Sequence, residues 1–463
     1  MKVHVTGVGG VAMGNLAAML RKLGHTVTGS DRDLYPPMSD RLKEWKIEAR
    51  HFDTANVRDV DLCIIGNVIS RGNPEVEAVL NSSVPYMSLP QALFEFFLKS
   101  RQVVVAAGTH GKTTTTFLTH HILSEAGLKP GLFAGGVRAD GMDGFAIPGS
   151  KYFVIEGDEY DSAFFDKGSK FLHYRPRYLI IGAIEFDHAD IFKDITEYML
   201  PFRRLIRMIP SEGLVVANYD SPGVRTVLKD YSFSKLEWIS NKSRKGISGF
   251  KRKQNRMYLD GVGDLQNFPL IGDYNARNAL AAARVALALG IRPEVIRDAI
   301  ATFPGVLRRQ QIRFQSNSVT MIEDFAHHPT AVSETIAAAR QSFPGRKVTV
   351  LFEPRSASSH RLEFQADYAR AFQKADNVYI TEVFNRQKVS GDERLNVKEL
   401  VAGLGKKKKG TFAYAKDPQS LFASFEKKFS RSRTGDVILV LSNGAFGGIY
   451  KSLETFLEKS VRS

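Results

Sequence analysis

The sequence predicts an α/β protein of three domains, the first and third Rossmann-like and the central one a P-loop domain. Three observations lead to this prediction. The chain has 463 residues, more than a single hydrophobic core sustains. Short apolar runs, typical of buried parallel strands, alternate with helical patterns along its length. Polar or glycine-rich residues follow most of those runs, as at the carboxyl edge of an open parallel sheet.

Composition and charge narrow the class of protein. Cys63 is the single cysteine, which excludes an intramolecular disulfide framework. Met1–Gly7 enters a strand without a signal-peptide pattern, and no apolar run reaches the roughly 20 residues of a membrane span, so we expect a cytoplasmic protein. The net charge of +15 includes one dense run, Lys406–Lys409, and no nucleic-acid-binding motif. We therefore expect anionic small-molecule substrates and no nucleic-acid or membrane partner, although a generally basic proteome would explain the charge equally well. No protein partner is evident from the sequence.

The first domain, residues 1–100, begins with a strand at Val3–Thr6 and a glycine turn at Gly7–Gly10. A second strand, His25–Gly29, leads to Ser30-Asp31, where an acid that binds a ribose would lie. Further strands are expected at 61–66 and 84–87, with a helix at 73–80. The turn supports a diphosphate or sugar-nucleotide site, although a plain tight turn before a Rossmann-like helix explains it equally well.

The second domain, residues 101–303, opens with the strand Val103–Val105 and the segment Gly108–Thr114. A glycine turn before a helix supplies converging N–H groups for phosphates, and the helix dipole adds positive potential. Lys112 is placed to reach the β- and γ-phosphates, and the Thr113 hydroxyl to hold Mg²⁺. Ala106 replaces the first glycine of the general motif. The segment nevertheless predicts nucleoside triphosphate binding.

Two acidic segments follow strands of this domain. Residues 156–161 come after the strand Tyr152–Ile155, and residues 185–190, which contain His188, come after Tyr178–Ile181. Carboxylates and one imidazole beside a P-loop favour a Mg²⁺ site. The domain closes with Gly272–Asn278 and an alanine-rich helix to Leu289.

The third domain, residues 304–463, starts at the turn Phe303–Gly305. Four strands are expected, each followed by polar or glycine-rich residues that predict a site at one sheet edge. They are Val319–Ile322, Val348–Phe352, Asn377–Thr381 and Asp436–Leu441.

These motifs, in this order and over essentially the whole chain, resemble the Mur ligases of peptidoglycan metabolism. The motifs are Ala-Gly-Thr-His-Gly-Lys-Thr-Thr-Thr, Glu-x-Asp-Glu-x-Asp, Glu-x-Asp-His-x-Asp, Gly-x-Tyr-Asn-x-x-Asn and Asp-Phe-x-His-His-Pro. Ala183 and Tyr274 stand where the family commonly has Asn and His. No lysine lies between Lys193 and Lys229, where several members carry a carbamylated lysine. The resemblance implies an ATP-dependent ligase that forms a carbon–nitrogen bond through an acyl phosphate.

Five segments are similar to the branch of the family that joins UDP-N-acetylmuramate to the tripeptide L-alanyl-γ-D-glutamyl-meso-diaminopimelate in peptidoglycan recycling. The segments are 35–39, 70–74, 164–171, 353–356 and 442–448. The nearest alternative is the branch that adds L-alanine. A nicotinamide-dependent dehydrogenase built on the first glycine turn would leave the P-loop and the acidic segments unexplained, and a regulatory module would bind ATP without catalysis.

The resemblance implies roles for individual residues. Lys112, His188 and Arg309 are the expected catalytic groups. Mg²⁺ would be held by Thr113, Glu156 and His188. The expected ATP-binding residues are Gly108, Thr109, His110, Gly111, Lys112, Thr113, Thr114, Asn275, Asn278, Arg309 and Asp324. The UDP-sugar is expected at Gly7, Gly9, Gly10, Ser30, Asp31, Asn67 and Ser70, and the peptide at Arg355, Ser356, Asn443 and Gly444.

Overall fold

The computed structural model describes residues 1–253, 256–385, 391–407, 409–429 and 435–462, which form two compact units. The first unit comprises residues 1–185, 195–268 and 277–304, and the second comprises residues 186–194, 269–276 and 305–463. The first unit contains two large sheets and the second contains one, each of them mostly parallel. The predicted α/β class with three sheets is confirmed, while the domain boundaries near residues 100 and 303 remain predictions.

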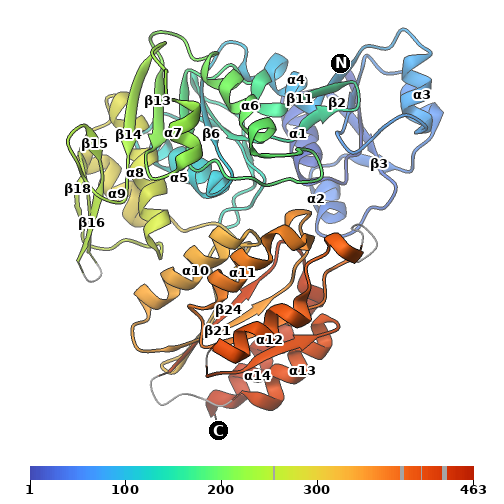
Figure 1. Cartoon of the computed structure of the whole chain (residues 1–463). Coiled ribbons are helices and arrows are strands. Elements are labelled where there is room, and N and C mark those ends of the chain that lie inside the picture. The colour runs from blue at the N-terminus through green and yellow to red at the C-terminus, as the bar shows by residue number, and fades with distance from the viewer. Residues whose placement is uncertain (254–255, 386–390, 408, 430–434, 463) are drawn as a thin grey trace. The chain divides into compact units, whose positions relative to one another are not determined.

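The first sheet has five parallel strands in the order β3-β2-β1-β4-β5. It belongs to the blue, N-terminal part of the ribbon in Figure 1. The strands are β1 (Lys2–Thr6), β2 (Thr26–Ser30), β3 (Glu48–Arg50), β4 (Leu62–Ile65) and β5 (Tyr86–Ser88). Its helices are α1 (Val11–Lys22), α2 (Met38–Glu44), η1 (Thr54–Val57), α3 (Pro74–Leu80), α4 (Leu89–Leu93) and η2 (Phe94–Leu98). The helix expected at 73–80 is confirmed. The Asn73 side chain accepts hydrogen bonds from the N–H groups of Glu75 and Val76, and Pro74 occupies the first turn.

The second sheet has eight strands in the order β15-β14-β13-β12-β6-β9-β7-β8, parallel except for the β7–β8 pair. The strands are β6 (Gln102–Ala107), β7 (Gly131–Phe133), β8 (Phe145–Ala146), β9 (Tyr152–Gly157), β12 (Tyr178–Ile181), β13 (Leu214–Asn218), β14 (Lys235–Ile239) and β15 (Ile247–Ser248). The helices are α5 (Lys112–Glu125), η3 (Lys170–His173), α6 (Ile195–Ile206), α7 (Pro222–Val227), α8 (Asp273–Ala288) and α9 (Pro293–Thr302).

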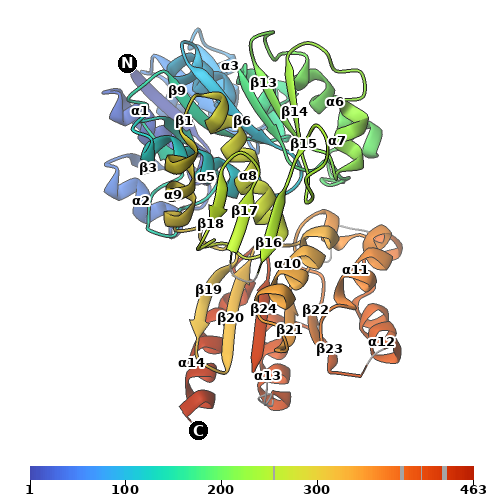
Figure 2. The ribbon, with the colours of Figure 1, turned by 90° about the vertical axis from the view of Figure 1, so that its left-hand side faces the viewer.

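Two antiparallel elements accompany this sheet. A small sheet of β16 (Phe250–Lys253), β17 (Arg256–Leu259) and β18 (Gly263–Leu265) lies beside α8 and α9 (Figure 2). The hairpin of β10 (Asp161–Ala163) and β11 (Asp166–Ser169) carries Phe164 and Phe165 at its turn. Both rings pack against the hydrophobic cluster around Val57 and Cys63 of the first sheet.

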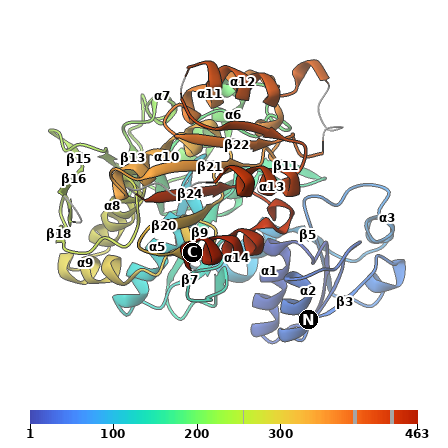
Figure 3. The same cartoon turned by 90° about the horizontal axis from the view of Figure 1, so that it is seen from below.

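The third sheet runs β19-β20-β24-β21-β22-β23, with only the edge strand β19 antiparallel among the described strands. The strands are β19 (Gln311–Gln315), β20 (Val319–Asp324), β21 (Lys347–Phe352), β22 (Asn377–Thr381), β23 (Phe412–Ala415) and β24 (Asp436–Leu441). Helices α10 (Pro329–Ser342), α11 (Gln365–Phe372) and α12 (Val397–Lys407) pack on one face. Helices α13 (Pro418–Lys428) and α14 (Ile449–Arg462) pack on the other, as Figure 3 shows. Short helical turns η4 (Ser358–His360), η5 (Leu362–Phe364), η7 (Gly391–Glu393) and η8 (Phe446–Gly448) complete the unit.

The alternation of side chains along the third sheet explains its two cores. In β24, Val437 and Leu439 belong to the cluster with α10, α11 and α12, whereas Ile438 and Val440 belong to the cluster with α13 and α14. A strand buried on both faces reads as a continuous apolar run, which is why Asp436–Leu441 could be predicted.

Strands β9 and β20 extend past their predicted ends, so Glu156 and Asp324 lie within a strand and not after it. Strand β9 continues through Glu156 and Gly157, because β6 pairs with it as far as Ala107. Strand β20 likewise includes Asp324, which is paired with Leu441 of β24. No helix in the described part of the chain combines the length and apolar character needed to cross a bilayer.

Candidate active site

Two glycines, Gly108 and Gly111, shape the loop between β6 and α5, where phosphate binding is predicted. Gly111 adopts a φ of 78°, a left-handed conformation that favours glycine, immediately before the first residue of α5. A side chain at Gly108 would meet the Ala183 carbonyl oxygen at 2.7 Å. The Thr109 N–H donates to that same oxygen at 2.6 Å. Ala183 therefore supports the loop through its backbone carbonyl, a contact that does not depend on the side chain at this position.

Lys112 begins α5 and is largely buried. Its ammonium lies 2.9 Å from each carboxylate oxygen of Glu159, which is itself 1% exposed. Burial alone would lower the pKa of Lys112, but the charges of Glu159, Asp158 and Glu156 outweigh burial and raise the pKa. The side chain is thus held in its charged form at the start of the helix.

The residues of the first acidic segment have different partners. Glu156 Oε1 accepts a hydrogen bond from the Thr113 hydroxyl at 2.8 Å, and its other oxygen accepts from the Gly135 N–H at 2.8 Å. Asp158 pairs with Lys170 at 2.6 Å, and Asp161 pairs with Lys167 at 2.6 Å. The hydroxyl–carboxylate pair of Thr113 and Glu156 is a donor set of hard oxygens, which suits Mg²⁺.

Asn278 lies next to the P-loop, whereas Asn275 is used differently. A side chain at Gly111 would meet the Asn278 amide oxygen at 2.8 Å. A pocket of the first unit is lined by residues of both segments, including His110, Lys112, Arg277 and Asn278. In the second unit the Asn275 amide donates to Gln310 Oε1 at 2.7 Å and to the Ile271 carbonyl at 3.0 Å. The structure therefore brings Asn278, but not Asn275, into the same compact unit as the P-loop.

The second unit holds the predicted arginine, Arg309, just before β19 and the predicted aspartate, Asp324, at the end of β20. The Arg309 guanidinium lies 4.3 Å from the centre of the Phe325 ring. Asp324 is buried, and burial raises its pKa. Its two oxygens accept hydrogen bonds from the N–H groups of Gln310, at 2.8 Å, and Ala326, at 2.7 Å.

Arg308, the residue before Arg309, supports the loop after β24. It donates to Glu323 Oε1 at 3.0 Å and to the carbonyl oxygens of Ser442 and Gly444, at 3.2 and 2.6 Å. Arg308 therefore supports the loop that follows β24. Arg309 is the arginine that remains a candidate for contact with the substrate.

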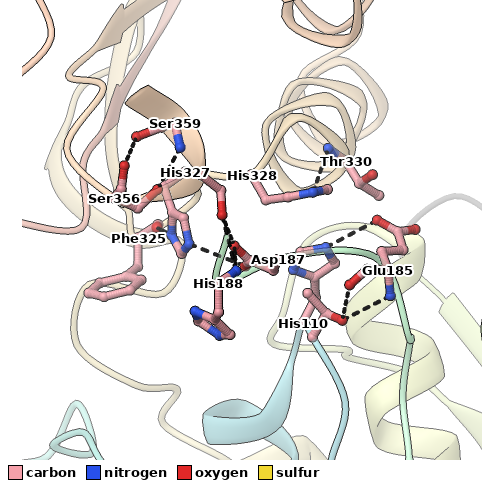
Figure 4. A network of polar contacts seen from close by, with 12 residues as sticks. His110, Glu185, Asp187, His188, Phe325, His327, His328, Thr330, Ser356 and Ser359 are labelled. Carbon is pink, nitrogen blue, oxygen red and sulfur yellow. Dashed lines mark hydrogen bonds and ion pairs between the residues drawn. The ribbon is translucent and has the colours of Figure 1, made fainter. Parts of the chain in front are cut away.

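The histidine motifs meet around Asp187 in the second unit (Figure 4). Asp187 is buried and accepts hydrogen bonds from the Ser358 hydroxyl and from the His188 N–H. The His327 Nε2 atom lies 3.8 Å from Asp187 Oδ2. Burial alone would raise the pKa of Asp187, but His327, His188 and His328 lower it well below its usual value. His188 has a φ of 56°, and its backbone N–H also donates to the Ser358 hydroxyl at 3.1 Å.

His110 and Glu185 form a separate pair in the first unit. The His110 Nε2 atom lies 3.3 Å from Glu185 Oε2 (Figure 4). The Thr109 hydroxyl donates to the Glu185 carbonyl oxygen and accepts from the Glu185 N–H. The Glu-x-Asp-His motif is thus divided, because Glu185 belongs to the first unit and His188 to the second. The sequence motif itself gives no indication of this division.

The glycine turn after β1 is fixed by Ser30 and Asp31. The Ser30 carbonyl accepts hydrogen bonds from the N–H groups of Gly7 and Val8, at 2.8 and 3.0 Å. Asp31 Oδ2 accepts from the Gly9 N–H at 2.8 Å. The Ser30 side chain is fully buried and its hydroxyl donates to Glu75, so Ser30 supports the turn from below in this structure. Asn67 and Ser70 lie between β4 and α3 and are at least partly exposed.

A buried polar network that the sequence did not predict lies under this turn. Glu75 of α3 is fully buried, and five groups surround its carboxylate. They are Ser30 Oγ at 2.6 Å, Thr6 Oγ1 at 2.8 Å, His4 Nε2 at 3.3 Å, Asn56 Nδ2 at 2.7 Å and the Asp53 N–H at 3.3 Å. Only the position of Glu75 in the first turn of a helix could have signalled a buried carboxylate.

The predicted peptide residues meet at the edge of the third sheet. The Arg355 guanidinium lies 3.8 Å from the centre of the Phe384 ring and 3.8 Å from Glu353. It passes so close to Gly444 that a side chain there would meet Arg355 Cδ at 2.3 Å. Ser356 Oγ accepts a hydrogen bond from the Ser359 N–H at 3.1 Å. Among the described residues, the buried side-chain oxygen of Asn443 finds no hydrogen-bond partner.

Comparison with known proteins gives matches to three family models. They are "Mur ligase family, catalytic domain" over residues 2–101, "Mur ligase middle domain" over 106–286, and "Mur ligase, glutamate ligase domain" over 308–444. Together these models cover most of the chain.

Individual relatives match over the full length. A UDP-N-acetylmuramate–L-alanyl-γ-D-glutamyl-meso-2,6-diaminoheptandioate ligase of Escherichia coli is 37% identical, and the alignment covers 100% of both chains. The ligase of the same name from Haemophilus influenzae is 34% identical over 97% of this chain and 98% of its own. The crystal structure of a murein peptide ligase from Psychrobacter arcticus superimposes with a TM-score of 0.69 at 30% identity, covering 99% of this chain and 98% of that one.

Proposed function

The chain belongs to the Mur ligase family, and we propose that it joins UDP-N-acetylmuramate to the tripeptide L-alanyl-γ-D-glutamyl-meso-diaminopimelate with hydrolysis of ATP to ADP and phosphate. The observation that carries this proposal is the 37% identity, over the full length of both chains, to a ligase named for that reaction. The reaction would serve peptidoglycan recycling. Because its substrates include ATP and a UDP-sugar, we also propose that the protein acts in the cytoplasm.

The chemistry requires positive charge around a transferring phosphoryl group. The lactyl carboxylate attacks the γ-phosphorus of ATP, ADP leaves, and the tripeptide amine then displaces phosphate from the acyl phosphate. A carboxylate and a triphosphate repel each other, so the site must neutralise both. Lys112, held in its charged form at the start of α5, is the residue of the first unit best placed for this role.

Thr113 and Glu156 are the residues that would hold Mg²⁺ in the first unit, and His188 is proposed as a further ligand. The contact of 2.8 Å between the Thr113 hydroxyl and the Glu156 carboxylate supports the pairing. Bound Mg²⁺ would neutralise phosphate charge and polarise the γ-phosphoryl group. Excess chelator should abolish activity and added Mg²⁺ should restore it. Full activity in chelator would exclude this metal site.

Arg355 and Asn443 support the proposal of a peptide subsite that binds charged groups of the peptide. The planar guanidinium offers two parallel donors to a carboxylate, and the unsatisfied Asn443 oxygen is an acceptor for an ammonium or amide N–H. Diaminopimelate carries both kinds of group at its free end, and L-alanine has no such extension. This pairing favours the tripeptide over L-alanine as the acceptor.

The test is ADP release with UDP-N-acetylmuramate and ATP, comparing no acceptor, L-alanine and the tripeptide. We expect release that depends on the tripeptide and very little with L-alanine. Equal use of L-alanine would overturn the substrate assignment, and release independent of any acceptor would overturn the ligase reaction. Arg355→Ala should raise the KM for the tripeptide at least 10-fold, as expected for one charge-assisted pair, with the KM for ATP unchanged. Arg370→Ala, which removes an exposed arginine paired with Asp367, is the matched control.

A further inference from the structure

Lys112 is held by the carboxylate of Glu159, a residue that takes no part in the proposed binding of ATP, Mg²⁺ or peptide. Glu159 lies in the loop after β9 and places both side-chain oxygens 2.9 Å from the Lys112 ammonium. The side chain of Lys112 is 14% exposed and that of Glu159 is 0% exposed, so neither side chain can move freely in solvent. The contact therefore gives Lys112 one defined position at the start of α5.

Glu159 is itself braced from the other side. The Tyr198 hydroxyl, from helix α6, donates to Glu159 Oε1 at 3.1 Å, and Tyr198 is fully buried. The same hydroxyl lies 3.1 Å from Thr109 Oγ1 of the P-loop. A continuous chain of contacts thus runs from the loop through Tyr198 and Glu159 back to Lys112.

From this geometry we propose that Glu159, braced by Tyr198, is a positioning residue that orients Lys112 for phosphoryl transfer. The inference rests on the proposed function and adds a residue to it. Lysine has a flexible four-carbon stem and three N–H donors. A carboxylate that accepts two of those donors fixes the stem and lets the third turn toward a phosphate oxygen.

Stability alone is a poor explanation for this pair. Burying two opposite charges costs desolvation energy that their attraction often fails to repay, so such a pair is weak evidence of stabilisation. A well-placed cation at a phosphoryl-transfer site, in contrast, acts only while it is correctly oriented, and small misplacements cost about 10²-fold in rate. The effect should appear in kcat, because the P-loop N–H groups bind the triphosphate whether or not Lys112 is aligned.

The experiment measures kcat and the KM for ATP, UDP-N-acetylmuramate and tripeptide in Glu159→Gln, Glu159→Asp and Tyr198→Phe. Glu159→Gln should lower kcat about 10²-fold and leave the KM for ATP within about 3-fold. Glu159→Asp, which keeps the charge on a shorter stem, should recover part of kcat. Tyr198→Phe should lower kcat by a smaller factor, because it removes the brace and leaves the ion pair.

Glu237→Gln is the matched control, since Glu237 is largely buried and pairs with Arg284 at 2.6 Å within the same unit. It should leave kcat unchanged. Wild-type kcat in Glu159→Gln would overturn the proposal, as would an equal loss in Glu237→Gln. If Glu159→Gln does not fold, Glu159→Asp and Tyr198→Phe decide the question. Wild-type turnover in the same assay tests the proposed function separately, because the inference concerns only the ratio of variant to wild type.

Discussion

Replacement of Glu75 by glutamine tests the buried network beneath the glycine turn. The Glu75 carboxylate is fully buried and accepts hydrogen bonds from the hydroxyls of Thr6 and Ser30, and the Ser30 carbonyl in turn holds Gly7. Glu75→Gln keeps the shape of the side chain and removes the charge. We expect a less stable first sheet and a higher KM for UDP-N-acetylmuramate.

The magnitude follows from the pKa of Glu75. Burial alone would raise this pKa, but hydrogen bonds from His4, Asn56 and Ser30 outweigh burial and lower it from 4.5 to about 2. A difference of that size corresponds to about 3 kcal/mol of unfolding free energy. Because the folded pKa is the lower one, this stabilisation is complete above the unfolded pKa of about 4.5 and is lost as pH falls through about 2. About 1.5 kcal/mol of it should remain at pH 3.

Urea unfolding followed by Trp45 fluorescence, in a Trp238→Phe background, measures the difference. Wild type should exceed Glu75→Gln by about 3 kcal/mol at pH 7 and by about half as much at pH 3. Glu77 lies on the same helix as Glu75, and Glu77→Gln, which breaks its exposed pair with Arg71, should change little. A difference that does not change with pH, or no difference at pH 7, would refute the reasoning.

Three further substitutions test the site. Lys112→Ala should reduce turnover at least 10²-fold and, by leaving a buried carboxylate unpaired, lower the unfolding free energy by about 3–5 kcal/mol, measured by steady-state kinetics and urea titration. Gly111→Ala should raise the KM for ATP several-fold. Alanine is strained in the left-handed conformation of Gly111, and its methyl group, 2.8 Å from Asn278 Oδ1, would displace the Asn278 amide. Gly444→Ala should raise the KM for the tripeptide, because its methyl group would lie 2.3 Å from Arg355 Cδ.

Each of these has a control within the chain. In Lys112→Met/Glu159→Gln the buried charge is removed as well, so stability should recover while turnover stays low. Gly290→Ala introduces the same left-handed strain, at a φ of 80°, where no atom lies within 4 Å of the new methyl group. Gly403→Ala adds a methyl group in a helix with equally open surroundings. Unchanged kinetics in Gly111→Ala or Gly444→Ala would mean that Asn278 or Arg355 does not contact substrate.

The sequence predicted those parts of the fold that depend on local pattern. Apolar runs buried on both faces located the central strands, and the Gly-Lys-Thr segment after such a run located the P-loop. Short edge strands such as β3 and β23 and the antiparallel sheet of β16, β17 and β18 were not predicted. Their stability comes from pairing with neighbours, so their own residues show little periodicity.

The candidate site was predicted residue by residue but not in its pairings. Thr113 and Glu156 were expected together and lie 2.8 Å apart. The partnership of Lys112 with Glu159, and the use of Asn275 to hold Gln310, depend on contacts between residues 47 and 35 positions apart. Side-chain pairings over such separations depend on how whole helices and strands pack, so they cannot be predicted from one sequence.

The division of the chain between the two units has a consequence for recombination among related enzymes. The chain passes from one unit to the other five times, so the second unit contains residues 186–194 and 269–276 as well as residues 305–463. Phe186 and Ile271 pack against its hydrophobic cluster, and the Phe186 carbonyl oxygen lies 3.2 Å from His328 Nε2. A crossover at residue 304 would exchange the third sheet but not residues 186–194 and 269–276. The core would then combine the sheet of one parent enzyme with these two segments of the other. Hybrid enzymes should therefore fold only when all three segments of the second unit come from the same parent.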